Sequence, residues 1–387
     1  MVPIMQSRQG SVLSYDGKDS DSAPSLLHGR AGAAMRALLG LLALAALFSG
    51  CSDVAYYWQA GVGQWEILSR RRAISDVLED PQVDEQVKGK LRLVLKVQKF
   101  SQERLALPSD SQYRYYSDLG RKFVSWLTVA SDAYQIREYQ HCFLIVGCLG
   151  YKGFFEKEDA DAFAADLAAQ GYDVMVRPVK AYSTLGWFDD PVLNTFIRGS
   201  DLQLIATILH EQAHTLMFLK GDTAFSESFS TFVEEEGVRR YLLRSGESGA
   251  PRLARYLAVN EDRRRFREIV LGGRERLERL YASGKPKAEM TVEKRKLFAL
   301  LKTNYQKAKK SFKIVSYDGW FNRELNNAHL VGFQHYRSWI NAFRALFEGE
   351  GQDFNRFYGA VRKLAELPKE EREARLKAME ENSIANS

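Results

Sequence analysis

Cysteine is scarce in this chain, and neither sign of charge dominates it. The 387 residues include 3 cysteines and carry a formal net charge of +6. The positive excess is spread along the chain, and no stretch interleaves basic with aromatic residues in the manner of a nucleic-acid-binding surface. We therefore expect no nucleic-acid partner. Neither Cys142 nor Cys148 has a second Cys or His pair at zinc-ligand spacing, which argues against a zinc site built on cysteine.

The sequence also lacks an apolar run long enough to span a bilayer comfortably, which takes roughly 20 residues. The run from Ala37 to Phe48 is shorter, and it lies between Met35-Arg36 and Ser49-Gly50-Cys51. A short positive start, an apolar core and a small-residue junction are typical of a secretory signal, here residues 35–50. The junction resembles a bacterial lipobox, whose cysteine, here Cys51, is lipidated. The alternative is an uncleaved N-terminal anchor helix.

Residues 1–34 are rich in Ser, Gly and Asp, and we expect them to be unstructured or to precede the true start at Met35. Either interpretation of the apolar run places the body of the protein outside the cytoplasm. We expect it in the bacterial cell envelope, on the periplasmic side, held to the outer membrane by a lipid anchor.

That compartment favours a disulfide between the two remaining cysteines, Cys142 and Cys148. The bridge requires the chain to fold back near Val146-Gly147, because a fully extended strand holds the two sulfurs too far apart. Two buried thiols on such a strand are the alternative.

The apolar pattern predicts one α+β unit over 51–387, mainly helical with a small β-sheet. A helical part over about 56–110 is interrupted at Arg70–Arg72, a sheet-containing part follows over about 111–200, and helices fill about 201–381. The sheet part has a strand candidate from Phe123 and a strand–helix–strand unit in which Pro178 marks an edge strand or its end. The elements of that unit are a strand over Cys142–Tyr151, a helix over Lys157–Gln170 and a strand from Asp173.

The strongest chemical signal is His210-Glu211-Gln212-Ala213-His214, on a largely buried helix that starts at Asp201. Histidines at i and i+4 project from one face of a helix about one turn apart. Two neutral imidazoles at that separation can bind one zinc ion, and Glu211 is placed to act on a metal-bound water. Two packing histidines are the alternative, but buried polar groups are costly unless something pairs them.

Around this motif the chain resembles the family of predicted aminopeptidases, which are bacterial lipoproteins with a zinc-peptidase motif. The resemblance implies a zincin-like metallopeptidase fold with an HExxH active-site helix, a zinc cofactor and a peptide substrate. Ser226 and Ser230 depart from the family pattern, which favours Asn and Ala there. The stretches that carry the resemblance are Tyr-Tyr-Trp-Gln-Ala at 56–60, Ala-Tyr-Ser-Thr-Leu-Gly-Trp-Phe-Asp-Asp-Pro-Val-Leu-Asn-Thr at 181–195, the HExxH motif at 210–214, Lys-Gly-Asp-Thr-Ala-Phe-Ser-Glu-Ser-Phe-Ser-Thr-Phe-Val-Glu-Glu-Glu-Gly at 220–237 and Tyr-Asp-Gly-Trp-Phe-Asn-Arg-Glu-Leu-Asn-Asn-Ala at 317–328.

The zinc requires a third protein ligand, and two carboxylates compete for this role on a second helix that begins around Thr223–Ser226. Glu234 lies at a distance from His214 that is familiar from thermolysin-like enzymes. Glu227 stands in Ser-Glu-Ser-Phe-Ser, which is similar to the Asn-Glu-x-Phe-Ala segment that carries the ligand in related enzymes. Local sequence favours Glu227, because the turn between the helices can vary in length. Glu234, on the same helical face, is then expected to orient a histidine through its second ring nitrogen.

Other positions are candidates for substrate binding or catalysis. Tyr336, which resembles a family tyrosine, and His335 are candidate donors to the tetrahedral oxyanion. Tyr182–Gly186 forms either an edge strand that pairs with the substrate backbone or a core-packing turn. Asp189-Asp190-Pro191 caps a short helix or binds a substrate amine, and capping is the commoner role. Glu235 and Glu236 are expected on a solvated acidic surface, and His141 and His329 in ordinary surface or packing roles.

These features predict a zinc-dependent peptidase, an aminopeptidase by its resemblance, that hydrolyses peptide bonds in the envelope. Zinc on His210, His214 and Glu227 would lower the pKa of its water to roughly 7. Glu211 would take the proton and pass it to the leaving amine. An endopeptidase of envelope quality control and a non-catalytic zinc-binding lipoprotein stay open as alternatives, although an intact Glu211 argues against the latter.

Overall fold

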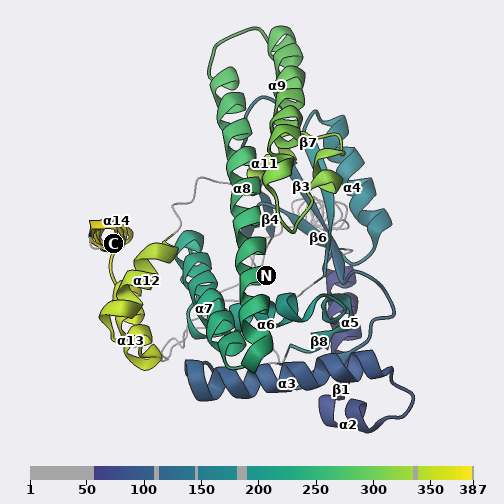
Figure 1. Ribbon diagram of the computed structural model, residues 1–387. Helices are drawn as coiled ribbons and strands as arrows, with labels where there is room; N and C mark the ends of the chain where they lie inside the picture. The colour runs from purple at the N-terminus through teal and green to yellow at the C-terminus, as the bar shows by residue number, and fades with distance from the viewer. Residues whose placement is uncertain (1–55, 109–112, 144–146, 181–189, 334–338, 386–387) are drawn as a thin grey trace, which may run out of the picture.

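The computed structural model describes residues 56–108, 113–143, 147–180, 190–333 and 339–385. In this part of the chain helices predominate, and the strands form two three-stranded sheets and one two-stranded sheet (Figure 1). The mainly helical α+β composition predicted from the sequence is therefore confirmed. Cys51 and the predicted signal lie outside the described residues. Among the helices that are described, none is long and apolar enough to cross a membrane.

The N-terminal part is helical except for one short strand. Residues 56–69 form a helix, and the interruption at Arg70–Arg72 contains strand β1 (Arg71–Ala73), which pairs with β2 (Tyr115–Ser117). Three residues carry no strand periodicity of their own, so the pairing with a distant segment decides their conformation. The helices that follow are α2 (Ile74–Glu79) and α3 (Glu85–Leu105).

The central sheet is antiparallel, with strand order β6–β3–β7. Helix α4 (Lys157–Ala169) packs on it, and the Thr128 hydroxyl donates to the Ala160 carbonyl across 3.1 Å. β7 is an edge strand, the position where a proline such as Pro178 is tolerated. The strands of this sheet are β3 (Ser125–Ser131), β6 (Lys152–Phe154) and β7 (Asp173–Val179).

A two-stranded hairpin of β4 (His141–Phe143) and β5 (Gly147–Leu149) carries the two cysteines. Cys142 lies opposite Cys148 in the antiparallel pair, and a disulfide joins them. Gly147 has φ +75°, a left-handed conformation that favours glycine and suits a chain reversal.

The second three-stranded sheet, with order β1–β2–β8, leads into the principal helices. β8 (Val192–Leu193) runs parallel to β2 and is followed by α5 (Asn194–Ile197) and α6 (Asp201–Leu216). The Asn194 amide ties this junction to the segment before β3, since it accepts from Leu119 N and donates to the Arg121 carbonyl.

Helices α6 and α7 (Thr223–Leu243) pack against each other in the main core, joined by a short turn at Gly221, where φ is +84°. Ile205, Ile208 and Leu209 of α6 are fully buried, and each contributes about 1.5–3 kcal/mol. α7 approaches its neighbours closely at Gly237, where a Cβ would stand 2.9 Å from side-chain carbons of Leu105 and Leu209.

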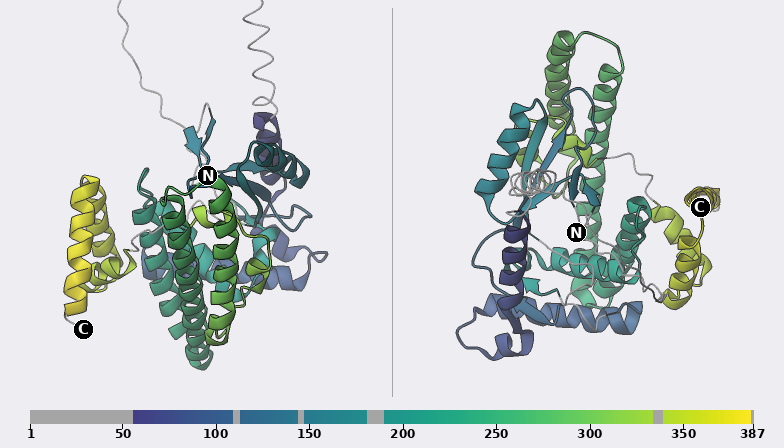
Figure 2. Two further views of the ribbon diagram at one scale, coloured as in Figure 1. Left: turned by 90° about the horizontal axis from the view of Figure 1, so that it is seen from above. Right: turned by 180° about the vertical axis from the view of Figure 1, so that it is seen from behind.

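Two groups of helices flank this pair. α8 packs on α7 and forms a long hairpin with α9, while α12 to α14 lie on the side of α7 away from the central sheet (Figures 1 and 2). The main core draws on residues from Ile74 to Leu376, so the three parts predicted from the sequence share it. The remaining helices are α8 (Gly249–Tyr281), α9 (Lys287–Ala308), α10 (Asp318–Phe321), α11 (Ala328–Val331), α12 (Ile340–Gly349), α13 (Phe354–Ala365) and α14 (Lys369–Ala385), with the short 3₁₀ helices η1 (Gly246–Ser248) and η2 (Lys309–Ser311).

Candidate metal centre

Helix α6 presents His210 and His214 on one face. The helix begins at Asp201 because the Ser200 hydroxyl caps it by accepting from Gln203 N. The spacing of four residues brings the two rings together, with their Nε2 atoms 3.1 Å apart and their planes at 80°. Two ring nitrogens therefore approach the same point in space.

Helix α7 brings Glu227 to that point. The Asp222 carboxylate caps the helix by accepting from Phe225 N, which sets where its first turn begins. Glu227 Oε2 lies 3.6 Å from His210 Nε2, and Glu227 Oε1 lies 3.4 Å from His214 Nε2. Of the two carboxylates that the sequence left in competition, Glu227 is the one that faces both Nε2 atoms. Its side chain is 52% exposed, against 6% for His214, so the cluster opens to solvent on the Glu227 side.

The other nitrogen of each ring has a partner of its own. His210 Nδ1 lies 3.1 Å from Glu234 Oε2, and His214 Nδ1 lies 3.0 Å from Ser230 Oγ. Glu234 in turn accepts a hydrogen bond of 2.9 Å from the Tyr256 hydroxyl on α8. A carboxylate can only accept, so we assign the ring proton of neutral His210 to Nδ1, which leaves its Nε2 lone pair directed at Glu227.

These donors suit a divalent cation. One atom each of His210, His214 and Glu227 lies within 4.8 Å of the others, and two imidazoles with one carboxylate are a ligand set of catalytic zinc sites. Burial opposes a charge on His210, but its hydrogen bonds with Glu227 and Glu234 outweigh burial and raise its pKa to about 10. Burial likewise acts to raise the pKa of Glu227, yet the two imidazoles lower it to about 2. The cluster thus favours positive charge where the Nε2 atoms and Glu227 converge.

The family model described as Putative aminopeptidase matches residues 55–376. The chain belongs to this family. Neither the curated proteins nor the solved structures yield a match. The matched region includes the whole donor set on α6 and α7, and membership indicates a hydrolase that acts on peptides.

Glu211 lies beside the donors in a partly buried position. Burial raises its pKa, the two histidines lower it, and the charges of Glu227 and Asp190 raise it further. Tyr113 lies in the same electrostatic field, because burial and the charges of Glu211 and Asp190 hold the pKa of its hydroxyl well above its usual value. Tyr113 also has φ +57°, uncommon for a residue other than glycine, and its N–H donates to the Asp190 carbonyl across 3.0 Å.

Two expectations about acidic residues were wrong. Asp190 does not cap α5, because the N-cap is Leu193 and no side chain bonds there; Asp190 is instead 3% exposed. Glu236 is not a solvated surface group, since it is 6% exposed and accepts from Arg239 and Arg240. Arginines three and four residues further along a helix reach the same carboxylate, which allows it to be buried.

Several predicted site residues lie outside the described residues, namely Tyr182–Gly186, Asp189, His335 and Tyr336. Trp339, the first described residue after Tyr336, donates its N–H to the Ser228 hydroxyl across 3.0 Å, next to Glu227 on α7. His141 and His329 are not among the converging donors; burial lowers the pKa of each to about 4, and both are buried.

Two residues that hold the cluster were not predicted from the sequence. Ser230 appeared only as a departure from the family pattern, yet it is fully buried against His214. Tyr256 reaches Glu234 from another helix, 22 residues further along the chain. Ser230 stands three residues after Glu227, which is a helical spacing that could have suggested it, but no local signal points to Tyr256.

Proposed function

We propose that this chain is a zinc aminopeptidase with a zincin-like fold, in which His210, His214 and Glu227 hold the metal. The observation that carries the proposal is the convergence of two Nε2 atoms and one carboxylate in a member of an aminopeptidase family. When bound, zinc supplies Lewis-acid chemistry: it lowers the pKa of a water and polarises the scissile carbonyl.

The chain's own residues position the ligands and move the proton. Glu234 and Ser230 hold the Nδ1 side of the rings, so both Nε2 lone pairs stay available. Glu211 takes a proton from the attacking water as the new C–O bond forms. It then gives that proton to the leaving nitrogen as the C–N bond breaks. No other co-reactant is required.

We also propose that the protein acts in the bacterial envelope, anchored by lipid on Cys51. The helix that follows this cysteine supports the idea, because Trp58 and Trp65 are 75% and 71% exposed and lie on one helical face at i and i+7. Exposed tryptophans suit the membrane–water interface. Mass spectrometry of the N-terminus tests this: a mature chain that begins at a lipid-modified Cys51 is expected, and an unmodified Cys51 that still follows residues 35–50 would contradict lipid anchoring.

The proposed chemistry is tested with Glu211→Gln in the full chain, beside Glu247→Gln as a matched control on the exposed η1 turn. Glu211→Gln should retain zinc, because Glu211 is not among the three converging donors, and should lose turnover of peptides by about 10²- to 10⁴-fold. Glu247→Gln should match the wild type in both measurements.

Exopeptidase specificity is tested on the same preparation. Peptides with a free amino terminus should be cleaved one residue at a time, and N-acetylated peptides should resist cleavage. Full turnover by Glu211→Gln would refute the role of Glu211 as the base. Equal cleavage of blocked and free peptides would identify an endopeptidase instead.

A further inference from the structure

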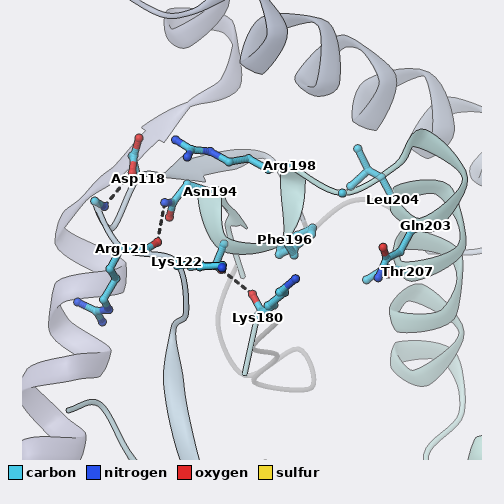
Figure 3. Close-up of a pocket in the computed structure, with 13 residues that line it drawn as sticks. Asp118, Arg121, Lys122, Lys180, Asn194, Phe196, Arg198, Gln203, Leu204 and Thr207 are labelled. Atoms are coloured by element: carbon cyan, nitrogen blue, oxygen red, sulfur yellow. Dashed lines mark hydrogen bonds between the residues drawn. The ribbon is translucent and has the colours of Figure 1, made fainter. Parts of the chain in front are cut away.

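A pocket of about 560 Å³ opens beside the N-terminal half of α6 (Figure 3). Gln203 and Thr207 of α6 line one side of it. Lys122, Lys180 and Arg198 come from three other segments of the chain and line the rest. Figure 3 shows Lys122 and Lys180 across the pocket from the two α6 residues.

Positive charge is in excess around this pocket. Among the described residues that line it, Asp118 is the only acidic one, and the Asp118 carboxylate already accepts from Gly120 N. Arg121 is also occupied, because it pairs with Glu66 across 2.6 Å. Lys122, Lys180 and Arg198, here called the cationic trio, form no ion pair with any residue that the structure describes. All three are exposed, so they are accessible to a ligand.

The pocket and the proposed metal centre lie along the same helix, α6. Gln203, Thr207 and Glu211 follow one another at intervals of four residues and therefore share a face of α6. At a rise of about 1.5 Å per residue, Thr207 lies about 6 Å and Gln203 about 12 Å from Glu211 along the helix axis. An extended peptide covers about 3.3–3.6 Å per residue, so the α6 side of the pocket, measured along the helix axis, is about two to four residues from the bond that Glu211 would help to cleave.

We propose that the cationic trio binds a carboxylate of the peptide substrate, about two to four residues from the cleaved bond. This inference rests on the proposed function. In an aminopeptidase one residue precedes the cleaved bond, so a group this far away belongs to the C-terminal side of the substrate. The carboxylate is then either the C-terminus of a short peptide or an acidic side chain in a longer one. The N-terminal end of α6 adds a field that also favours an anion.

Binding is measured by calorimetry with full-length Glu211→Gln protein, so that hydrolysis is not required for a signal. The probes are trialanine, trialanine amide, hexaalanine and Ala-Ala-Glu-Ala amide. Trialanine should bind about five- to tenfold more tightly than its amide, the advantage expected from a few exposed charge pairs. Preference for trialanine alone identifies the peptide C-terminus as the bound group. Tight binding of the glutamate-containing amide identifies an acidic side chain.

The deciding variant carries Lys180→Gln and Arg198→Gln in addition to Glu211→Gln. A charge-matched control instead carries Arg295→Gln and Lys296→Gln, on the exposed face of α9, in the same Glu211→Gln background. Neutralising the pocket should abolish the tighter binding of trialanine relative to its amide and leave the affinity for trialanine amide unchanged. The control should still bind trialanine more tightly than its amide. Equal affinity for all four probes, or a preference that survives in the pocket variant, would overturn the proposal. Turnover by the wild-type protein is measured separately, so a failure of the proposed function is seen independently of this pocket.

Discussion

Two groups of ionisable side chains at helices α6 and α7 are built differently. At the turn between them, Arg372 Nη2 lies 2.7 Å from Asp222 Oδ2, and each side chain is 5% exposed. Arg372 also donates to the Leu367 carbonyl, so its donors meet acceptors. In the middle of the helices, His210, His214 and Glu227 instead direct their lone pairs at a common point. Charges that satisfy one another stabilise a fold, whereas lone pairs that converge select a cation.

The two groups should also respond differently to substitution. The Asp222–Arg372 pair is closed, and removing one partner leaves an uncompensated buried charge. The candidate metal centre is open on the side of Glu227, and Glu234 and Ser230 contact the histidines from the other side. We therefore expect changes at the first group to appear in stability, and changes at the second to appear in zinc affinity.

The largest expected effect is on stability. Arg372→Met should lower the free energy of unfolding by about 3–5 kcal/mol, because it leaves Asp222 buried without its partner. Arg375→Met, three residues along α14, breaks an exposed pair with Glu371 and should cost at most about 1 kcal/mol. Urea denaturation of the zinc-loaded full chain measures both. Equal losses in the two variants would show that burial of the Arg372 pair does not matter.

Glu234→Gln should weaken zinc binding by about 10- to 100-fold while leaving the unfolding midpoint of the zinc-free protein close to wild type. The reason is that glutamine holds His210 Nδ1 less firmly than a carboxylate does. Competition with a zinc chelator measures the affinity, and Glu247→Gln is the control. Wild-type zinc affinity in Glu234→Gln would mean that this carboxylate does not orient the ring.

Another carboxylate, Asp262, extends the comparison to a buried group whose hydrogen bonds come from the backbone. It is fully buried and accepts from the backbone N–H groups of Lys313, Ile314 and Val315. Burial alone would raise its pKa, but these three hydrogen bonds lower it below the usual value. Asp262→Asn should therefore lower stability at pH 7 by about 1–2 kcal/mol, since an amide presents only one acceptor oxygen.

The pH dependence follows from the sign of this shift. A depressed pKa means that the stabilisation is complete above the unfolded-state pKa, which is about 3.9, and is lost as the pH falls through the lower pKa of the folded state. The deficit of Asp262→Asn should therefore be constant from pH 7 to about pH 5 and shrink below pH 4. Denaturation curves across this range test it, with exposed Asp159→Asn as the control. A deficit that grows as the pH falls would contradict the shift.

The smallest effect is expected at Tyr256. Tyr256→Phe removes the hydrogen bond to Glu234 and keeps the ring, so zinc affinity should fall only severalfold, consistent with about 0.5–1.5 kcal/mol for one hydrogen bond. The same chelator competition measures it. If Tyr256→Phe lost more zinc affinity than Glu234→Gln, Tyr256 would not act through Glu234.

Much of the site could be predicted from local sequence because its residues lie on two consecutive helices. The spacing of four residues placed His210 and His214 on one face, and the segment around Glu227 favoured that residue over Glu234. The spacing of seven residues between Glu227 and Glu234 put both on the same side of α7, where the structure has them facing opposite edges of His210.

The rest depends on contacts between distant segments. Asp222 and Arg372 are 150 residues apart, and the sequence predicted only that both lie in a mainly helical part of the chain. Strand β1 is three residues long and acquires its conformation from β2. The cationic trio comes from three segments that only the fold brings around one pocket. No local sequence pattern predicts these pairings, because the partners are far apart in the sequence and meet only in the folded chain.

The central claim is that the two α6 histidines and Glu227 form a zinc site. The most direct test is the zinc content of full-length protein after dialysis against metal-free buffer, for the wild type and His214→Ala. We expect a single zinc ion per chain in the wild type and almost none in His214→Ala, with circular dichroism confirming that the variant is folded. A wild type without zinc, or a folded His214→Ala protein that retains it at full stoichiometry, would contradict the claim.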